Sequence, residues 1–208
     1  MLIGISGKAG CGKDYITQNW IIPFLQNELQ KSCLQLSFAD QIKVNVMTQN
    51  DIDYNDVYVN KTKDTRKLLQ LEGTEYGRMK HGKDIWIKYF SNWVDIFKKR
   101  GIKNIITPDV RFINEIDYIK SNGGIVIRII APLRNEKRLQ EESGGDINIY
   151  NDLKNHISEC ELDKINDSEF DFVIYNDISD GQDIQMSKLQ DFLRLKTIGK
   201  FAKYNKNI

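Results

Sequence analysis

Residues 2–15 read Leu-Ile-Gly-Ile-Ser-Gly-Lys-Ala-Gly-Cys-Gly-Lys-Asp-Tyr. The first four of them are apolar or small, as in a buried strand. The glycines at 7, 10 and 12 and the lysine at 13 then match the P-loop template through its lysine. Glycine permits backbone conformations in which successive N–H groups converge on phosphate oxygens, and the lysine adds a positive charge. The stretch therefore predicts a strand, a nucleotide phosphate-binding loop and a helix that begins near Gly12.

The template is not followed at position 14. It asks for Ser or Thr, whose hydroxyl contacts magnesium, whereas this chain has Asp14 followed by Tyr15. A glycine-rich turn without a ligand is the alternative interpretation of the whole stretch. The predicted nucleotide-binding residues are Gly7, Lys8, Ala9, Gly10, Cys11, Gly12, Lys13, Asp14 and Tyr15.

Length and composition restrict the class of protein. The chain has 208 residues, which suits a single domain with a sizeable core, and its net charge of +1 gives no reason to expect binding to nucleic acid or to a membrane. Its three cysteines have neither a metal spacing nor an even number for disulfides. No run of about eighteen apolar residues occurs. We expect a cytoplasmic protein whose partners are small anionic molecules.

Predicted strands at residues 2–5, 34–38, 104–107, 125–130 and 172–175 alternate with helical patterns. This alternation predicts an α/β fold, with a parallel sheet that carries helices on both faces. Three details are expected: a loop or a loosely ordered excursion over residues 48–60, a helix over 63–76 that Gly73 and Gly77 end, and a strand that Pro108 closes. Because ligands bind at the carboxyl ends of such strands, the P-loop, Asp40 and Asp109 should converge on one cleft.

Two groups of polar residues suit phosphoryl transfer. Asp109 is a candidate magnesium ligand, although it could merely cap the following helix together with Arg111. Arg66, Gln70 and Thr74 recur every fourth residue on one helical face, and with Arg78 they could hold a second phosphorylated molecule. A solvated helix face is the alternative for each of them alone.

Several stretches together resemble the deoxynucleoside monophosphate kinases of the bacteriophage and viral type, which are P-loop kinases. The resemblance rests on stretches spread over residues 2–177: Gly7 to Asp14, Ser37-Phe38-Ala39-Asp40 with Lys43, Arg66 to Gln70, Gly73-Thr74, Gly77-Arg78, Trp86, Asp109-Val110-Arg111-Phe112 with Asn114-Glu115, Gly123-Gly124, Ile127-Arg128, His156 to Glu159 and Asn176-Asp177. Tyr15 and Pro108 depart from the family pattern.

The resemblance implies transfer of the γ-phosphate of ATP to a deoxynucleoside monophosphate, with Mg²⁺ held by Asp109 and also, as an open alternative, by Asp14. One kinase domain, residues 1–208, would contain an acceptor-binding helical region near 38–100 and a polar, basic lid near 134–155. The expected catalytic residues are Lys13, Arg111, Arg134 and Arg138. The expected acceptor residues are Asp40, Lys43, Arg66, Gln70, Thr74, Arg78, Trp86 and Arg111.

Two alternatives to this function stay open. A P-loop kinase for another small phosphorylated acceptor, such as phosphomevalonate, would need a similar loop. A non-catalytic nucleotide-binding protein is also compatible with the missing hydroxyl at position 14. The sequence does not distinguish a monomer from a homodimer, and a viral origin of the gene would fit the family resemblance.

Overall fold

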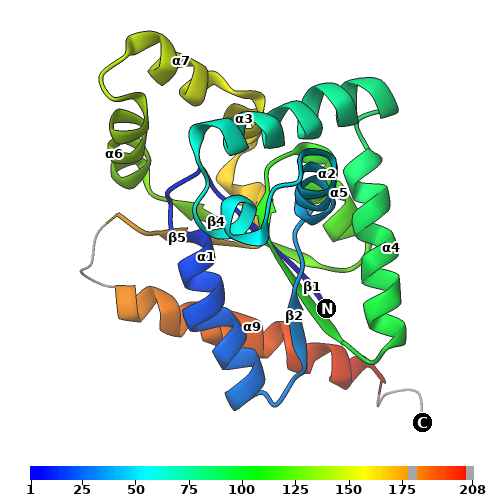
Figure 1. Ribbon diagram of the computed structural model, residues 1–208. Helices are drawn as coiled ribbons and strands as arrows, with labels where there is room; N and C mark the ends of the chain where they lie inside the picture. The colour runs from blue at the N-terminus through cyan, green and yellow to red at the C-terminus, as the bar shows by residue number, and fades with distance from the viewer. Residues whose placement is uncertain (178–181, 205–208) are drawn as a thin grey trace. The chain divides into compact units, whose positions relative to one another are not determined.

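The computed structural model describes residues 1–177 and 182–204, and side chains as far as residue 197 (Figure 1). The chain divides into two compact units. The sheet unit comprises Met1–Leu34 and Lys103–Ile208, and the helical unit comprises Gln35–Ile102.

A five-stranded sheet forms the centre of the sheet unit. Its strands are β1 (Leu2–Ser6), β2 (Cys33–Gln35), β3 (Asn104–Val110), β4 (Ile125–Ile130) and β5 (Phe172–Tyr175), in the order β2-β3-β1-β4-β5. The pairs β1–β3, β1–β4 and β4–β5 are parallel. The predicted α/β fold with a parallel sheet is therefore confirmed.

Alternating side chains of the central strands pack against helices on opposite faces of the sheet. Ile3 and Ile5 belong to a core shared with the first helix and with the C-terminal helix (Figure 1). On the other face a Cβ on Gly4 would lie 2.5 Å from the side chain of Ile119, so α5 packs closely against β1 there. The helical segments of this unit are α1 (Lys13–Ile16), η1 (Thr17–Ile21), η2 (Phe24–Glu28), α5 (Ile113–Ser121), α6 (Pro132–Ser143), α7 (Ile147–Asn155), α8 (Ile157–Cys160), η5 (Glu161–Lys164), η6 (Asp167–Glu169) and α9 (Gln182–Tyr204).

The helical unit has its own small core. Its segments are α2 (Asp40–Asn50), η3 (Asn55–Val59), α3 (Lys63–Leu71), η4 (Glu72–Met79) and α4 (Ile85–Lys99). The amphipathic stripe of α4 supplies Trp86, Phe90 and Val94, all buried. The ring of Phe90 lies 4.1 Å from that of Phe38, centroid to centroid. Tyr89 and Trp93, on the same helix, are each 40% exposed.

Three local expectations were wrong. The segment 48–60 is not a continuous loop, because α2 continues to Asn50 and η3 forms a further turn. The helix beyond α3 does not end at Gly73 or Gly77 but continues as the π-helical η4 to Met79. Strand β3 passes through Pro108 to Val110, with a register irregularity where the proline lacks an N–H to pair.

The polar segment 134–155 is more regular than its composition suggests, since α6 and α7 cover almost all of it. Pro132 stands at the first helical position of α6, where a missing N–H costs no hydrogen bond. None of the helices in the described part of the chain is long and apolar enough to cross a membrane.

Candidate nucleotide and acceptor sites

The loop after β1 has the backbone that its glycines predict. Gly7, Gly10 and Gly12 all have positive φ, at 151°, 81° and 89°. A Cβ on Gly12 would lie 2.5 Å from Nδ2 of Asn176, which donates a hydrogen bond of 2.8 Å to the carbonyl of Cys11. Because Gly12 has no side chain, Asn176 at the end of β5 can lie against the loop and form this hydrogen bond.

Lys13 is buried inside this loop. It is 7% exposed, and its ammonium donates to the carbonyls of Gly7 (2.7 Å) and Lys8 (2.8 Å). Burial lowers the pKa of Lys13, and the nearby guanidinium of Arg111 lowers it further. The ammonium is therefore positioned within the loop by backbone oxygens.

Glu159 connects the loop to Arg111. One carboxylate oxygen of Glu159 accepts the backbone N–H of Ala9 at 2.9 Å, and the other accepts a hydrogen bond from Arg111, which also reaches the carbonyl of Ser158 at 3.2 Å. Burial alone would raise the pKa of Glu159, but Arg111 and the N–H of Ala9 lower it below its ordinary value. Burial alone would lower the pKa of Arg111, but the negative charge of Glu159 raises it above its ordinary value. An ionised pair therefore lies directly against the loop.

The predicted metal ligands lie at the expected end of the sheet. Asp109 is near the carboxyl end of β3, and its Oδ1 accepts a hydrogen bond of 2.8 Å from Thr107. Asp14 and Tyr15 are exposed just after the loop. The described residues contain no cluster of three metal-ligating side chains. Mg²⁺ is commonly held by one or two carboxylates together with substrate phosphates and water, so this sparse donor set suits it.

Helix α6 lies against the loop. Asn135 donates 2.8 Å to the carbonyl of Ala9, and a Cβ on Gly10 would lie 3.1 Å from Cδ of Arg138. Arg138 pairs with Glu142 through Nε and Nη2, while its Nη1 is buried without a hydrogen-bond partner. A buried guanidinium nitrogen without an acceptor is costly, and an anion bound at the loop would relieve that cost.

Arg134 is exposed on the first turn of α6. A Cβ on Gly12 would lie 4.0 Å from Nη1 of Arg134. The structure thus brings all four sequence-predicted catalytic residues, Lys13, Arg111, Arg134 and Arg138, to the same loop of the sheet unit.

The predicted acceptor residues of the helical unit fall into separate groups. Asp40 accepts hydrogen bonds from the N–H of Ser37 (2.7 Å), from Lys43 (3.2 Å) and from the hydroxyl of Tyr58 (3.2 Å). The Lys43 ammonium also lies 4.2 Å from the Tyr58 ring centroid. Asp40 and Lys43 are therefore fixed in one polar cluster at the start of α2.

Arg66 and Gln70 are exposed on α3, and Thr74 follows on η4. The backbone changes from α-helical to π-helical hydrogen bonding between Gln70 and Thr74. Arg78 donates 2.8 Å to the carbonyl of Lys83. Arg66 and Gln70 thus belong to α3, and Thr74 and Arg78 to η4.

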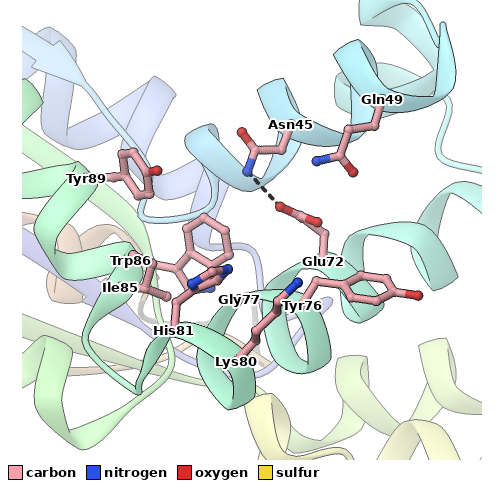
Figure 2. Close-up of a pocket in the computed structure, with 10 residues that line it drawn as sticks. All are labelled: Asn45, Gln49, Glu72, Tyr76, Gly77, Lys80, His81, Ile85, Trp86 and Tyr89. Carbon is pink, nitrogen blue, oxygen red and sulfur yellow. Dashed lines mark hydrogen bonds between the residues drawn. The ribbon is translucent and has the colours of Figure 1, made fainter.

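A pocket of about 420 Å³ lies within the helical unit (Figure 2). Trp86 is the one sequence-predicted acceptor residue in its wall. Its indole N–H donates 2.8 Å to the carbonyl of Gly73, and its ring fills the place that a side chain at Gly77 would occupy. The lining residues are Asn45, Gln49, Glu72, Tyr76, Gly77, Lys80, His81, Ile85, Trp86 and Tyr89.

Sequence reasoning assigned no role to several residues that shape these sites. Glu159 lies 150 positions beyond its partner Ala9, and Asn176 lies 165 beyond Cys11. Asp177 accepts the backbone N–H groups of Leu133 and Arg134, at 2.8 and 3.0 Å, and so caps the start of α6. The only available signal was that these residues fall in stretches that resemble the family.

The sequence is similar to sequences of known proteins. The family described as deoxynucleotide monophosphate kinase matches residues 13–182. A protein of Acanthamoeba polyphaga mimivirus, described as a candidate deoxynucleotide monophosphate kinase, is 30% identical over 146 residues, which are 64% of this chain and 75% of the mimivirus protein.

Solved structures resemble the fold. TT1252 from Thermus thermophilus is similar with a TM-score of 0.52 and 15% identity, covering 94% of this chain and 97% of that one. Shikimate kinase from Acinetobacter baumannii, in complex with shikimate, is similar with a TM-score of 0.46 and 13% identity, covering 93% of each chain. With the family match spanning most of its length, this chain belongs to the deoxynucleotide monophosphate kinase family.

Proposed function

We propose that the protein transfers the γ-phosphoryl group of ATP to the 5′-phosphate of a deoxynucleoside or nucleoside monophosphate. The observation that carries this proposal is the group of cations around the loop after β1: buried Lys13, ion-paired Arg111, and Arg138 with an unpartnered Nη1. Catalysis of phosphoryl transfer consists mainly of positioning and charge neutralisation, which such a group supplies. The family match supports the same reaction.

In this reaction an oxygen of the acceptor phosphate forms the new bond to the γ-phosphorus. The bond between that phosphorus and the β,γ-bridging oxygen breaks, and ADP leaves with the electron pair. Lys13 exchanges its two carbonyl partners for phosphate oxygens of ATP. Arg111, Arg134 and Arg138 neutralise charge on the transferring group.

Mg²⁺ fits Asp109, with Asp14 as the second available carboxylate. When bound, the ion neutralises charge on the phosphates of ATP. The residues on this chain orient the nucleotide: the loop N–H groups bind phosphate oxygens, and Asn135 fixes the Ala9 peptide from the side of α6.

The acceptor would bind to residues of the helical unit. Arg66, at the centre of α3, is suited to the monophosphate, since guanidinium pairs with phosphate bidentately. Asp40 and Lys43 form a fixed polar cluster, and Trp86 lines the pocket. We assign residues near 134–155 the role of a lid, because α6 carries two arginines beside the loop and closure would exclude water.

The test is ADP formation by the purified protein with ATP, Mg²⁺ and each nucleoside monophosphate in turn. We expect at least one nucleotide acceptor and a fall of kcat on the order of a hundredfold in Lys13→Met, which keeps much of the buried volume of the lysine. Turnover only with other phosphorylated acceptors would identify a different kinase. ATP binding without turnover with any acceptor would indicate a non-catalytic protein.

A further inference from the structure

Two carboxylates of one short segment lie against the loop after β1. The segment consists of α8 and η5, residues 157–164, and we call it the strap. Glu159 accepts the backbone N–H of Ala9 at 2.9 Å, and Asp163 accepts a hydrogen bond of 2.7 Å from the ammonium of Lys8. The strap thus places an anionic group on each of two consecutive residues of the loop.

The strap also pairs with the arginine that follows β3. Arg111 donates to the other carboxylate oxygen of Glu159 and to the carbonyl of Ser158. The side chain of Glu159 is 10% exposed, whereas the side chains of Lys8 and Asp163 are 39% and 43% exposed. An exposed ion pair contributes little to stability, so the contact between Lys8 and Asp163 is easily exchanged for another. One enclosed contact and one exposed contact therefore hold the strap on the loop.

The space between the strap and the loop is too small for a phosphate group. A cavity of about 20 Å³ lies there, which is room for about one water molecule. Three cations and both strap carboxylates are among its lining residues: Lys8, Arg111, Arg128, Glu159 and Asp163. A phosphate group that binds to these cations needs more room, so it can enter only if the strap moves away.

The strap and a nucleotide cannot share these contacts. Ala9 supplies a single backbone N–H, for which a carboxylate and a phosphate oxygen compete as two anionic acceptors. The ammonium of Lys8 has three donors, but a phosphate placed beside Asp163 would be repelled by the negative charge of that side chain. A triphosphate brings several oxygens to the loop at once, and it can replace both strap contacts with charge-assisted hydrogen bonds.

The far end of the strap is anchored on β4. Arg128 donates to the carbonyls of Leu162 and Ile165, at 3.2 and 3.3 Å, and its Nε lies 3.3 Å from the carboxylate of Asp167. The ring of Phe170 lies 4.8 Å from Cζ of Arg128, measured to the ring centroid. A strap that leaves the loop thus stays tethered beside it and can return when the nucleotide dissociates.

We propose that the strap and the phosphates of ATP compete for the loop, so that ATP binds only by displacing Glu159 and Asp163. This inference rests on the proposed function, in which the loop holds the phosphates of ATP. The strap is then an autoinhibitory element of the site. Lys8 and Arg111 exchange a carboxylate partner for phosphate when ATP binds, and they return to the carboxylates when the nucleotide leaves.

The first experiment uses a carbodiimide, which joins an ammonium and a carboxylate that are in contact through an amide bond. Mass spectrometry measures the yield of the product that links Lys8 to Asp163 in the wild-type protein. We expect this yield to fall about fivefold or more with saturating AMP-PNP and Mg²⁺. It should stay unchanged with adenosine, which has no phosphate. An equal yield with and without AMP-PNP overturns the inference.

A second ion pair of the same protein is the internal control for this reaction. Lys196 and Asp171 lie 4.0 Å apart beside the start of β5. The yield of their amide should not change with AMP-PNP. Equal falls for both links would mean that the nucleotide only slows the carbodiimide reaction, and this result also overturns the inference.

Hydrogen exchange of the wild-type protein gives a second readout that requires no variant. With AMP-PNP bound, the amides of residues 157–164 should exchange about threefold faster or more, while those of residues 7–14 exchange more slowly. Slower exchange over residues 7–14 with unchanged or slower exchange over residues 157–164 would mean that the strap stays in place over the nucleotide. That result overturns the inference.

Asp163→Asn removes the charge of the exposed contact and keeps the size of the side chain. We expect its Kd for AMP-PNP, measured by calorimetry, to fall about twofold to fivefold, the range for one exposed ion pair. Glu169→Gln is the matched control, because Glu169 is an exposed carboxylate beyond the strap, at the end of η6. Its Kd should equal that of the wild-type protein. Equal Kd values for the wild-type and Asp163→Asn proteins overturn the inference.

These measurements need neither an acceptor nor turnover, so they are separate from the test of the kinase activity. Displacement of the strap by AMP-PNP in a protein that phosphorylates no acceptor supports this inference while the proposed function fails. Turnover of a nucleoside monophosphate by a protein whose strap stays on the loop supports the proposed function and overturns this inference.

Discussion

The carboxylate of Glu159 accepts the backbone N–H of Ala9 at 2.9 Å, in the middle of the loop that we assign to the phosphates of ATP. A carboxylate and a phosphate compete for the same N–H groups, because both are anionic acceptors. Glu159 therefore stands where its negative charge opposes an incoming nucleotide, while it also orients Arg111.

Replacing Glu159 by Gln should tighten ATP binding in the absence of acceptor. The change removes a negative charge beside the phosphates, which in a partly hydrated site amounts to about 1 kcal/mol, or about fivefold in Kd. Isothermal titration calorimetry with ATP measures it. The control is Glu161→Gln, since Glu161 accepts the N–H of Ile113 instead. An ATP affinity that is unchanged or weaker in Glu159→Gln contradicts the prediction.

The pair formed by Glu159 and Arg111 should also make stability depend on pH. Arg111 and the N–H of Ala9 hold the pKa of Glu159 below 4.5, its ordinary value. The folded protein thus keeps this carboxylate ionised to lower pH than the unfolded chain does. Its contribution to stability is present above about pH 4.5 and is lost as the pH falls through the lowered pKa. The difference in Tm between the wild-type protein and Glu159→Gln should therefore shrink from pH 6 to pH 3, and a constant difference would argue against the ionised pair.

A side chain at Gly12 should destabilise the protein more than one at Gly82. The two glycines have similar φ, 89° and 94°, so alanine costs about 1–2 kcal/mol in backbone strain at each. At Gly82 the new Cβ meets nothing within 4 Å, whereas at Gly12 it lies 2.5 Å from Nδ2 of Asn176. Losing the Asn176 hydrogen bond adds about 1 kcal/mol or more. Urea denaturation of the two variants measures the loss in the free energy of unfolding. Equal losses would show that Asn176 can move away from position 12 without cost.

Arg138→Ala should lower kcat on the order of a hundredfold with the acceptor that the assay identifies, as the loss of a preorganised charge does. Lys137→Ala is the matched control, because Lys137 is the neighbouring cation on α6 and is highly exposed beside Glu141. Steady-state kinetics with both substrates saturating would measure the effect. Similar rates in the two variants would place Arg138 outside the reaction.

The parts of the molecule that the sequence predicts well are those that depend on neighbouring residues. Strand β1, the glycine conformations and the position of Lys13 all follow from one continuous stretch. The sheet follows from the alternation of apolar runs and helical patterns. Arg134 and Arg138 could be nominated because they lie in a polar, basic segment between two strands, and the structure places both beside the loop.

What the sequence could not predict depends on tertiary contacts. Glu72 looks like any solvated glutamate of a helix, and only the packing of α2 and α4 shows that it is buried. The sequence places Lys13 in the loop, but only the fold shows that its side chain is 7% exposed. The end of the helix was misplaced because Gly77, a residue that often follows a helix, is needed here to make room for the ring of Trp86.

Residues at the end of β5 fix the first turn of α6 in place. Asn176 holds the P-loop through the carbonyl of Cys11, and the next residue, Asp177, holds the first turn of α6 through two N–H groups. A helix that is held at its first turn moves least there and most at its other end. In a swing of α6, Arg134 would therefore keep its distance from the P-loop. Arg138, about 6 Å further along the axis, would travel several times as far.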